Sequence, residues 1–68
     1  MKPVIHYRSR GASGNVYWLL GAVSTTLREQ RRIAEYNDLR DRVLNAESYQ
    51  EALTIMGEYV TLIDDDAK

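Results

Sequence analysis

The chain has 68 residues, no cysteine, one histidine and a formal net charge of −1 at pH 7. This length excludes a second independent core, since domains commonly contain roughly 100–150 residues, and we expect residues 1–68 to form one small domain. The absence of cysteine excludes disulfides, and a single histidine is too few for a structural zinc site built from Cys and His ligands. Because so small a core usually needs further support, we expect a homodimer.

The longest apolar stretch of the chain runs from Val16 to Val23. A helix needs about 20 residues to cross a bilayer, so this much shorter stretch is predicted to be core and not a membrane span. No apolar run of signal-peptide length lies near the start of the chain, and the lack of cysteine fits a reducing compartment. The sequence therefore predicts a cytoplasmic protein without membrane contact.

The two halves of the chain carry opposite charge. Residues 1–32 contain six basic residues and one acidic residue, whereas residues 33–68 contain three basic and nine acidic residues. Such asymmetry indicates either a charged partner surface or an approach of the basic half of one subunit to the acidic half of another.

A short strand is predicted at residues 4–8, where the apolar faces of Ile5 and Tyr7 alternate with polar side chains. Residues 10–15 contain two glycines and good N-cap residues, which is typical of a turn followed by the start of a helix. Apolar residues then recur at the spacing of one helix face, and they predict a first helix. They are Val16, Leu19, Leu20, Val23 and Leu27.

A second helix is predicted over residues 33–46 from the same kind of spacing. Its apolar and aromatic positions are Ile33, Tyr36, Leu39, Val43 and Ala46. Residues 28–32 contain neither glycine nor proline to separate the two helices. One continuous helix across residues 15–46 is the alternative, but at about 30 residues it is much longer than the mean helix of about 11–12 residues. We therefore favour a break near Arg31.

A third helix is predicted to begin at Ser48, because Ser48 and Glu51 match the capping box that closes a helix N-terminus. Its expected apolar face runs from Ala52 to Ile63 at helical spacing. A strand at residues 58–63, which are rich in β-branched side chains, is the alternative. Residues 64–68 are expected to form a frayed acidic tail, since acids are unfavourable after a helix C-terminus.

The predicted fold class is therefore mostly α, with a short N-terminal strand followed by three helices. If residues 58–63 form a second strand, the fold is α+β with minor strand content.

No motif for catalysis, a cofactor or a metal is present. The glycine-rich turn from Gly11 to Asn15 precedes a helix, as phosphate cradles do, but it lacks the lysine and the third glycine of the known phosphate-binding fingerprints. His6 has no recognisable nucleophile or metal partner. We therefore expect no enzyme activity, no catalytic or metal-binding residues and no cofactor.

The candidate partner-binding residues combine aromatic rings with arginines. Tyrosine and tryptophan are favoured at protein interfaces, and Trp18 lies off the apolar stripe of the first helix. Helical geometry places Arg28, Arg31 and Arg32 on one side of the chain, where they are expected to form a charged surface. The full set is Arg8, Arg10, Tyr17, Trp18, Arg28, Arg31 and Arg32.

Several short motifs resemble those of small uncharacterised proteins of bacteriophages and integrated mobile elements. They are Ser13 to Tyr17, Leu19 to Gly21, Arg42-Val43, Ser48 to Leu53 and Glu58 to Val60. The resemblance extends from about Gly11 to Ile63. Proteins of that group often have a glycine near the end of the first helix, where this chain has Arg31-Arg32. The resemblance implies no activity, but it implies a mobile-element setting in which very small proteins commonly block or redirect a host protein.

These observations predict a non-enzymatic protein–protein interaction module, with an inhibitor or adaptor of a host protein as its expected role. The alternative is a small nucleic-acid-binding regulator that uses the basic residues of the N-terminal half. The near-zero net charge argues against this alternative, because nucleic-acid-binding domains are usually basic overall.

Overall fold

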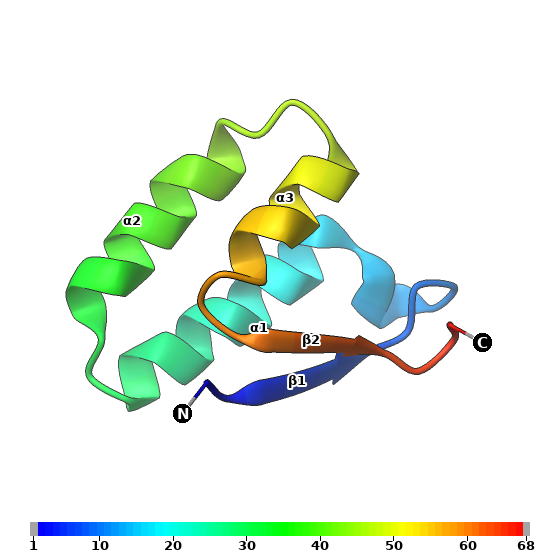
Figure 1. The fold of residues 1–68 in the computed structure, drawn as a ribbon, viewed down its shortest axis with the longest axis horizontal. Coiled ribbons are helices and arrows are strands. Elements are labelled where there is room, and N and C mark those ends of the chain that lie inside the picture. Colours follow the sequence, from blue (N-terminus) through cyan, green and yellow to red (C-terminus); the bar gives the residue numbers. More distant parts are fainter. Residues whose placement is uncertain (1, 68) are drawn as a thin grey trace.

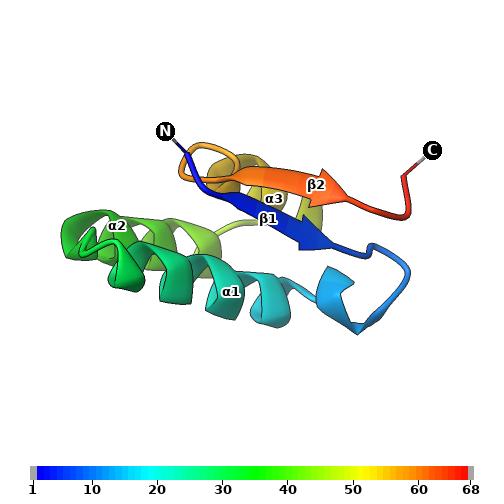
Figure 2. The same ribbon diagram turned by 90° about the horizontal axis from the view of Figure 1, so that it is seen from below.

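A computed structural model describes residues 2–67 of the chain. It contains two strands, three helices and one short 3-10 turn. In chain order they are β1 (Val4–Tyr7), η1 (Ala12–Gly14), α1 (Val16–Glu29), α2 (Ile33–Leu44), α3 (Tyr49–Met56) and β2 (Thr61–Asp64). Figure 1 shows how the three helices pack together beside the two strands. The strands form one layer with α1 and α2 beneath them (Figure 2). The fold is thus mostly α with minor strand content, as the sequence predicted.

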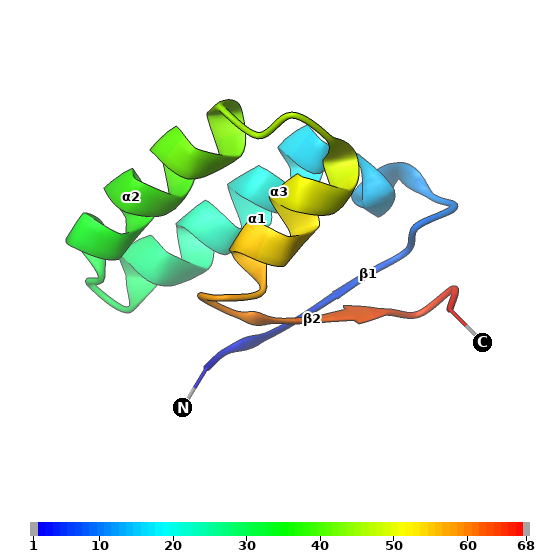
Figure 3. The same cartoon turned by 45° about the horizontal axis from the view of Figure 1, so that its top comes forward.

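The two strands, from opposite ends of the chain, form a parallel pair. The register runs from Val4 opposite Thr61 to Tyr7 opposite Asp64, and all three helices lie on the same side of the pair (Figure 3). The strand alternative for residues 58–63 is therefore confirmed for residues 61–63, whereas residues 58–60 lie in the turn before β2. The expected continuation of the third helix to Ile63 is wrong, because that helix ends at Met56 and the β-branched residues beyond it pair with β1 instead.

The pairing of β1 within the chain bears on the expected dimer. A lone N-terminal strand would have left its hydrogen-bonding groups without a partner and favoured strand pairing between two copies. Here the Thr61 amide donates to the Pro3 carbonyl oxygen at 2.8 Å and β1 has its partner in β2. An unpaired N-terminal strand is therefore no longer a reason to expect a dimer, and the homodimer stays a prediction.

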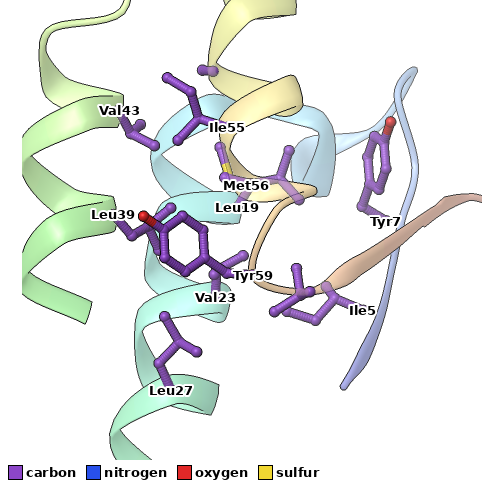
Figure 4. Close-up of a cluster of buried hydrophobic side chains, with 12 residues drawn as sticks. Ile5, Tyr7, Leu19, Val23, Leu27, Leu39, Val43, Ile55, Met56 and Tyr59 are labelled. Carbon is purple, nitrogen blue, oxygen red and sulfur yellow. The ribbon is translucent and has the colours of Figure 1, made fainter. Parts of the chain in front are cut away.

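The core lies between the sheet and the helices, and its buried residues come from β1, the three helices and the segment between α3 and β2. In β1, Ile5 and Tyr7 point into it while Val4 and His6 point away, which is the alternation expected of a strand with one covered face. Figure 4 shows Ile5 and Tyr7 in one cluster with buried side chains of the helices. The buried residues are Ile5, Tyr7, Leu19, Val23, Leu27, Leu39, Val43, Ala52, Ile55, Met56, Tyr59 and Val60.

The break between the first two helices falls at Arg31, so the prediction of two helices is confirmed. The Arg32 amide donates to the Leu27 carbonyl oxygen at 2.8 Å and the Arg31 amide donates to the Arg28 carbonyl oxygen at 2.9 Å. This is the Schellman arrangement that ends many helices, and its left-handed residue is usually glycine. Here the position is occupied by Arg31, with φ of 59°.

Both predicted helix starts are capped by side chains. The Ser48 hydroxyl accepts from the Glu51 amide at 3.1 Å, while the Glu51 carboxylate accepts from the Glu47 amide and not from that of Ser48. The Asn15 side chain accepts from the Tyr17 amide at 2.7 Å at the start of α1. The sequence therefore marked both starts correctly.

The predicted frayed tail is wrong for its first three residues. Asp64 is the last residue of β2, and its carboxylate accepts from the Ser9 amide at 3.1 Å. Asp65 pairs with His6 at 3.0 Å, and Asp66 accepts from the Arg10 amide at 2.9 Å. Parallel pairing brings the carboxyl ends of both strands to one edge, where the acids meet donors of the loop after β1. The last residue of the predicted tail, Lys68, lies outside the described residues.

Candidate functional site

The five candidate arginines occupy opposite ends of α1. Arg8 and Arg10 lie in the loop after β1, where the Arg8 amide donates to Ser13 of η1 at 2.8 Å. The Arg8 guanidinium donates to Asp66 at 3.1 Å, so an acid lies beside these arginines. The other three lie at the far end of α1, with Arg28 in its last turn, Arg31 at the helix break and Arg32 just before α2. The 14 residues of α1 span about 21 Å at 1.5 Å per residue. The structure therefore does not join the five arginines into one basic patch.

The arginines at the far end of α1 also have neighbours that balance or cover them. Arg32 donates to both carboxylate oxygens of Glu35, one of them at 2.8 Å, and this hydrogen bonding holds the pKa of the Glu35 carboxyl below its usual value. The Arg28 guanidinium lies 5.9 Å from the centre of the Tyr36 ring, within the range of cation–π attraction. Arg31 is exposed at the helix break. These contacts describe a solvated helix end rather than a preformed phosphate site.

Tyr17 and Trp18 are exposed, but they point to different sides of α1. The side chain of Tyr17 is 73% exposed and that of Trp18 is 46% exposed. Neighbouring residues of an α-helix are about 100° apart around its axis, since one turn takes 3.6 residues. Tyr17 lines a cavity between the helices, and Trp18 does not. The predicted pair is thus divided, and Tyr17 is the member that belongs to a concave surface.

That concave surface is an apolar groove where the start of α1, the end of α2 and the start of α3 come together. It encloses a cavity of about 250 Å³. Its rim carries three large side chains that are strongly exposed, namely Tyr17, Leu44 at 54% and Tyr49 at 41%. We call the surface formed by these three residues and the cavity between them the aromatic groove. The cavity walls are Val16, Leu20, Val43, Ala46, Glu47, Ser48 and Ala52.

Two features of the chain hold the aromatic groove in shape. The helix break at Arg31 turns the chain back, so that the end of α2 returns to the start of α1 (Figure 1). Tyr49 then ties α3 to the turn before α1, because its hydroxyl donates to the Gly14 carbonyl oxygen at 2.5 Å. A side chain at Gly14 would place a Cβ only 2.7 Å from the Arg8 carbonyl oxygen, so this close approach requires glycine.

A separate polar network anchors the segment after α3 to α2. The Tyr59 hydroxyl donates to the Asp38 carboxylate at 2.7 Å and accepts from Arg42 at 3.1 Å. Arg42 also pairs with Glu58 through two hydrogen bonds of 2.8 and 2.9 Å. Burial, followed by the hydrogen bond to Asp38, raises the pKa of the Tyr59 phenol. Every member has a partner, which is the property of a structural network.

The sequence reasoning named Tyr17 but missed two of the three rim residues. Leu44 lies next to the apolar stripe of the second helix and not on it, which was a usable signal of an exposed apolar side chain. Tyr49 lies inside the capping box, where only its role in starting a helix was considered. The convergence of these residues depends on how three helices pack.

Between residues 2 and 67, no helix has the length and apolar character needed to span a membrane. Over the same residues, no three His, Asp or Glu side chains gather in a way that would hold a metal ion. Comparison of the chain with protein-family models, with curated proteins and with solved structures found no match.

Proposed function

We propose that this protein is a non-enzymatic protein–protein interaction module that binds its partner through the aromatic groove. The observation that carries the proposal is the exposure of Tyr17, Leu44 and Tyr49 around one cavity. Large apolar and aromatic side chains that remain exposed together mark interaction sites on small proteins, whereas single exposed apolar residues need no explanation.

The chemistry of the aromatic groove suits a protein ligand. Tyrosines supply a wide apolar contact with a polar edge, and binding energy concentrates on such residues when they surround a pocket. Tyr49 is also preorganised, because its hydroxyl is already bonded to Gly14. A partner side chain that enters the cavity therefore meets mostly apolar walls, with Glu47 and Ser48 as the polar exceptions, and does not leave the Tyr49 hydroxyl unsatisfied.

The resemblance to small proteins of phages and mobile elements supports a more specific role. In that setting the partner is a host protein, and the module acts as its inhibitor or adaptor. The absence of cysteine favours a cytoplasmic site of action. We therefore propose a host protein as the partner and the cytoplasm as the place where the two proteins meet.

The test compares capture of partners by the wild-type protein and by a variant with Tyr17→Ala and Leu44→Ala. Loss of an interface anchor costs about 2 kcal/mol or more, so we expect at least a roughly thirtyfold weaker interaction with the captured protein. The matched control is Ile33→Ala, since Ile33 is an exposed apolar residue at the opposite end of α2. Circular dichroism should show the same helix content in all three proteins. Equal capture by the double variant, or loss of capture by Ile33→Ala alone, would contradict the proposal.

A further inference from the structure

The wall of the aromatic groove carries a charge that specifies the chemistry of its partner, and this inference rests on the function proposed above. Ten residues line the cavity, and the charged residue among them is Glu47. Glu47 is exposed and belongs to the segment between α2 and α3. Because the walls around it are mostly apolar, its charge acts on a bound ligand with less screening than in open water.

The cap of α3 fixes the position of Glu47. The Glu51 carboxylate accepts from the Glu47 amide at 3.0 Å, and the Ser48 hydroxyl accepts from the Glu51 amide at 3.1 Å. These two hydrogen bonds hold the backbone of Glu47 at the groove wall, while Glu47 itself is exposed to solvent. The acidic group is thus preorganised for a ligand, which reduces the cost of binding.

An anionic ligand does not suit the groove, although α1 and α3 both begin beside it. Free amides at a helix N-terminus attract anions. At the start of α1, however, the Tyr17 amide already donates to the Asn15 side chain. At the start of α3, the Glu51 amide donates to Ser48, and the charges of Glu47 and Glu51 balance the helix dipole. The groove therefore attracts a positive charge.

The size of the cavity suits one side chain of a protein better than a whole small molecule. Its volume is about 250 Å³, whereas pockets for small molecules commonly measure about 300–1,000 Å³. The mostly apolar walls favour an apolar side chain inside the cavity. The rim adds the exposed rings of Tyr17 and Tyr49, against which a neighbouring side chain of the partner can pack.

We propose that the aromatic groove binds a short segment of a partner protein in which an arginine lies beside a large apolar residue. The apolar side chain fills the cavity, and the arginine lies on the rim and pairs with Glu47. Arginine suits this place better than lysine, because its planar guanidinium bonds both oxygens of a carboxylate and also stacks on aromatic rings. One cavity and one charge are matched by two neighbouring residues, so a short segment is sufficient.

A two-fold dimer of this chain centred on the groove is disfavoured. Such an interface uses the same patch on both subunits. It would place Glu47 of one copy against the groove wall of the other, where the charged lining residue is again Glu47. Like charges across an interface oppose binding. The segment is therefore assigned to a different protein.

The first experiment selects random linear peptides displayed on phage against the wild-type protein and, in parallel, against Glu47→Arg. Peptides enriched on the wild type should combine a large apolar residue with an arginine. Peptides enriched on Glu47→Arg should carry aspartate or glutamate in its place, because the charge on the wall is reversed. The matched control is Glu29→Arg, which makes the same change of charge at the exposed last residue of α1 and should enrich the wild-type motif.

The second experiment measures the affinity of one peptide enriched on the wild type by fluorescence anisotropy. Glu47→Gln keeps the shape of the side chain and removes its charge. It should bind the peptide about two- to fivefold more weakly, as expected for the loss of one solvent-accessible ion pair. Added salt should weaken binding to the wild type more than binding to Glu47→Gln. Circular dichroism should show the same helix content in both proteins.

The outcomes separate this inference from the function on which it rests. If Tyr17→Ala with Leu44→Ala abolishes peptide binding but Glu47→Gln binds as tightly as the wild type, the arginine is overturned and the groove remains the binding site. If the double variant binds the peptide as the wild type does, the groove itself is overturned. Enriched peptides without arginine, or the same motif on Glu47→Arg, also overturn the inference.

Light scattering on the protein alone tests the assignment to a different protein. We expect a mass that does not change with protein concentration. A mass that rises with concentration for the wild type and not for Glu47→Arg would overturn the assignment and indicate that a second copy occupies the groove.

Discussion

Replacement of Arg31 by glycine should stabilise this protein. Arg31 joins α1 to α2 with φ of 59°, in the left-handed region where the Cβ of an L-residue crowds the following carbonyl oxygen. That conformation costs an ordinary residue about 1–2 kcal/mol, and glycine avoids the cost. Arg31 is an exposed residue, so removal of its side chain uncovers little buried surface.

The expected gain follows from two opposing terms. Relief of the left-handed conformation contributes about 1–2 kcal/mol, and the greater freedom of glycine in the unfolded chain opposes it by about 0.5–1 kcal/mol. The net effect is an increase of about 0.5–1 kcal/mol in the free energy of unfolding. For a domain of this size, 1 kcal/mol shifts the melting temperature by about 4–8 °C, so Arg31→Gly should melt about 2–8 °C higher.

Urea and thermal unfolding followed by circular dichroism measure this difference. The matched control is Arg31→Ala, which removes the same long side chain but keeps the Cβ, and it should show no gain. The sign of the effect tests the helix break itself. Glycine inside one continuous helix would destabilise the protein by about 1 kcal/mol relative to alanine, so a lower stability of Arg31→Gly than of Arg31→Ala would refute the reasoning.

Two further predictions concern helix capping and acid stability. Ser48→Ala should lower the free energy of unfolding by about 0.5–2 kcal/mol, because the Glu51 amide loses its acceptor; an unchanged urea midpoint would contradict this role. The side chain of Ser9, with the Ser9 and Asp66 amides, holds the pKa of Asp64 below its usual value. A carboxyl with a lowered folded-state pKa stabilises the fold above its unfolded-state pKa, and this contribution is lost as the pH falls below about 4. Asp64→Asn should therefore lose less stability than the wild type between about pH 5 and pH 2 in urea titrations, and parallel pH profiles would argue against it.

Local chemistry in the sequence determined much of the fold. The apolar stripe of α1, the caps at Asn15 and Ser48, and the alternation in β1 appear in the structure where the sequence predicts them. The predicted stripe of the second helix is confirmed at Leu39 and Val43, whereas Ile33 is exposed and Ala46 lies beyond the end of α2. These features depend on residues within about one helical turn or one strand of each other, so they can be recognised without knowledge of distant contacts.

Residues 58–63 are the clearest case that the sequence left open. Their spacing suits either a helix or a strand, and the choice was made by hydrogen bonds such as that from Thr61 to Pro3, which joins opposite ends of the chain. The position of the Asp64 side chain also depends on a residue remote in sequence. Its carboxylate accepts a hydrogen bond from the Ser9 amide, which lies in the loop after β1. A partner so remote in sequence leaves no local signal.

The surfaces proposed for binding were likewise decided by tertiary packing. The sequence predicted Tyr17 as a candidate binding residue, but only the return of α2 to the start of α1 placed Leu44 and Tyr49 beside it. It also placed Arg8 and Arg32 in one set of candidate binding residues, yet the length of α1 separates them. Periodicity specifies which face of a helix is apolar, whereas the residues that meet across elements depend on how those faces pack. Sequence alone therefore determined the elements of this protein, and tertiary structure decided its strand pairing and its candidate binding surfaces.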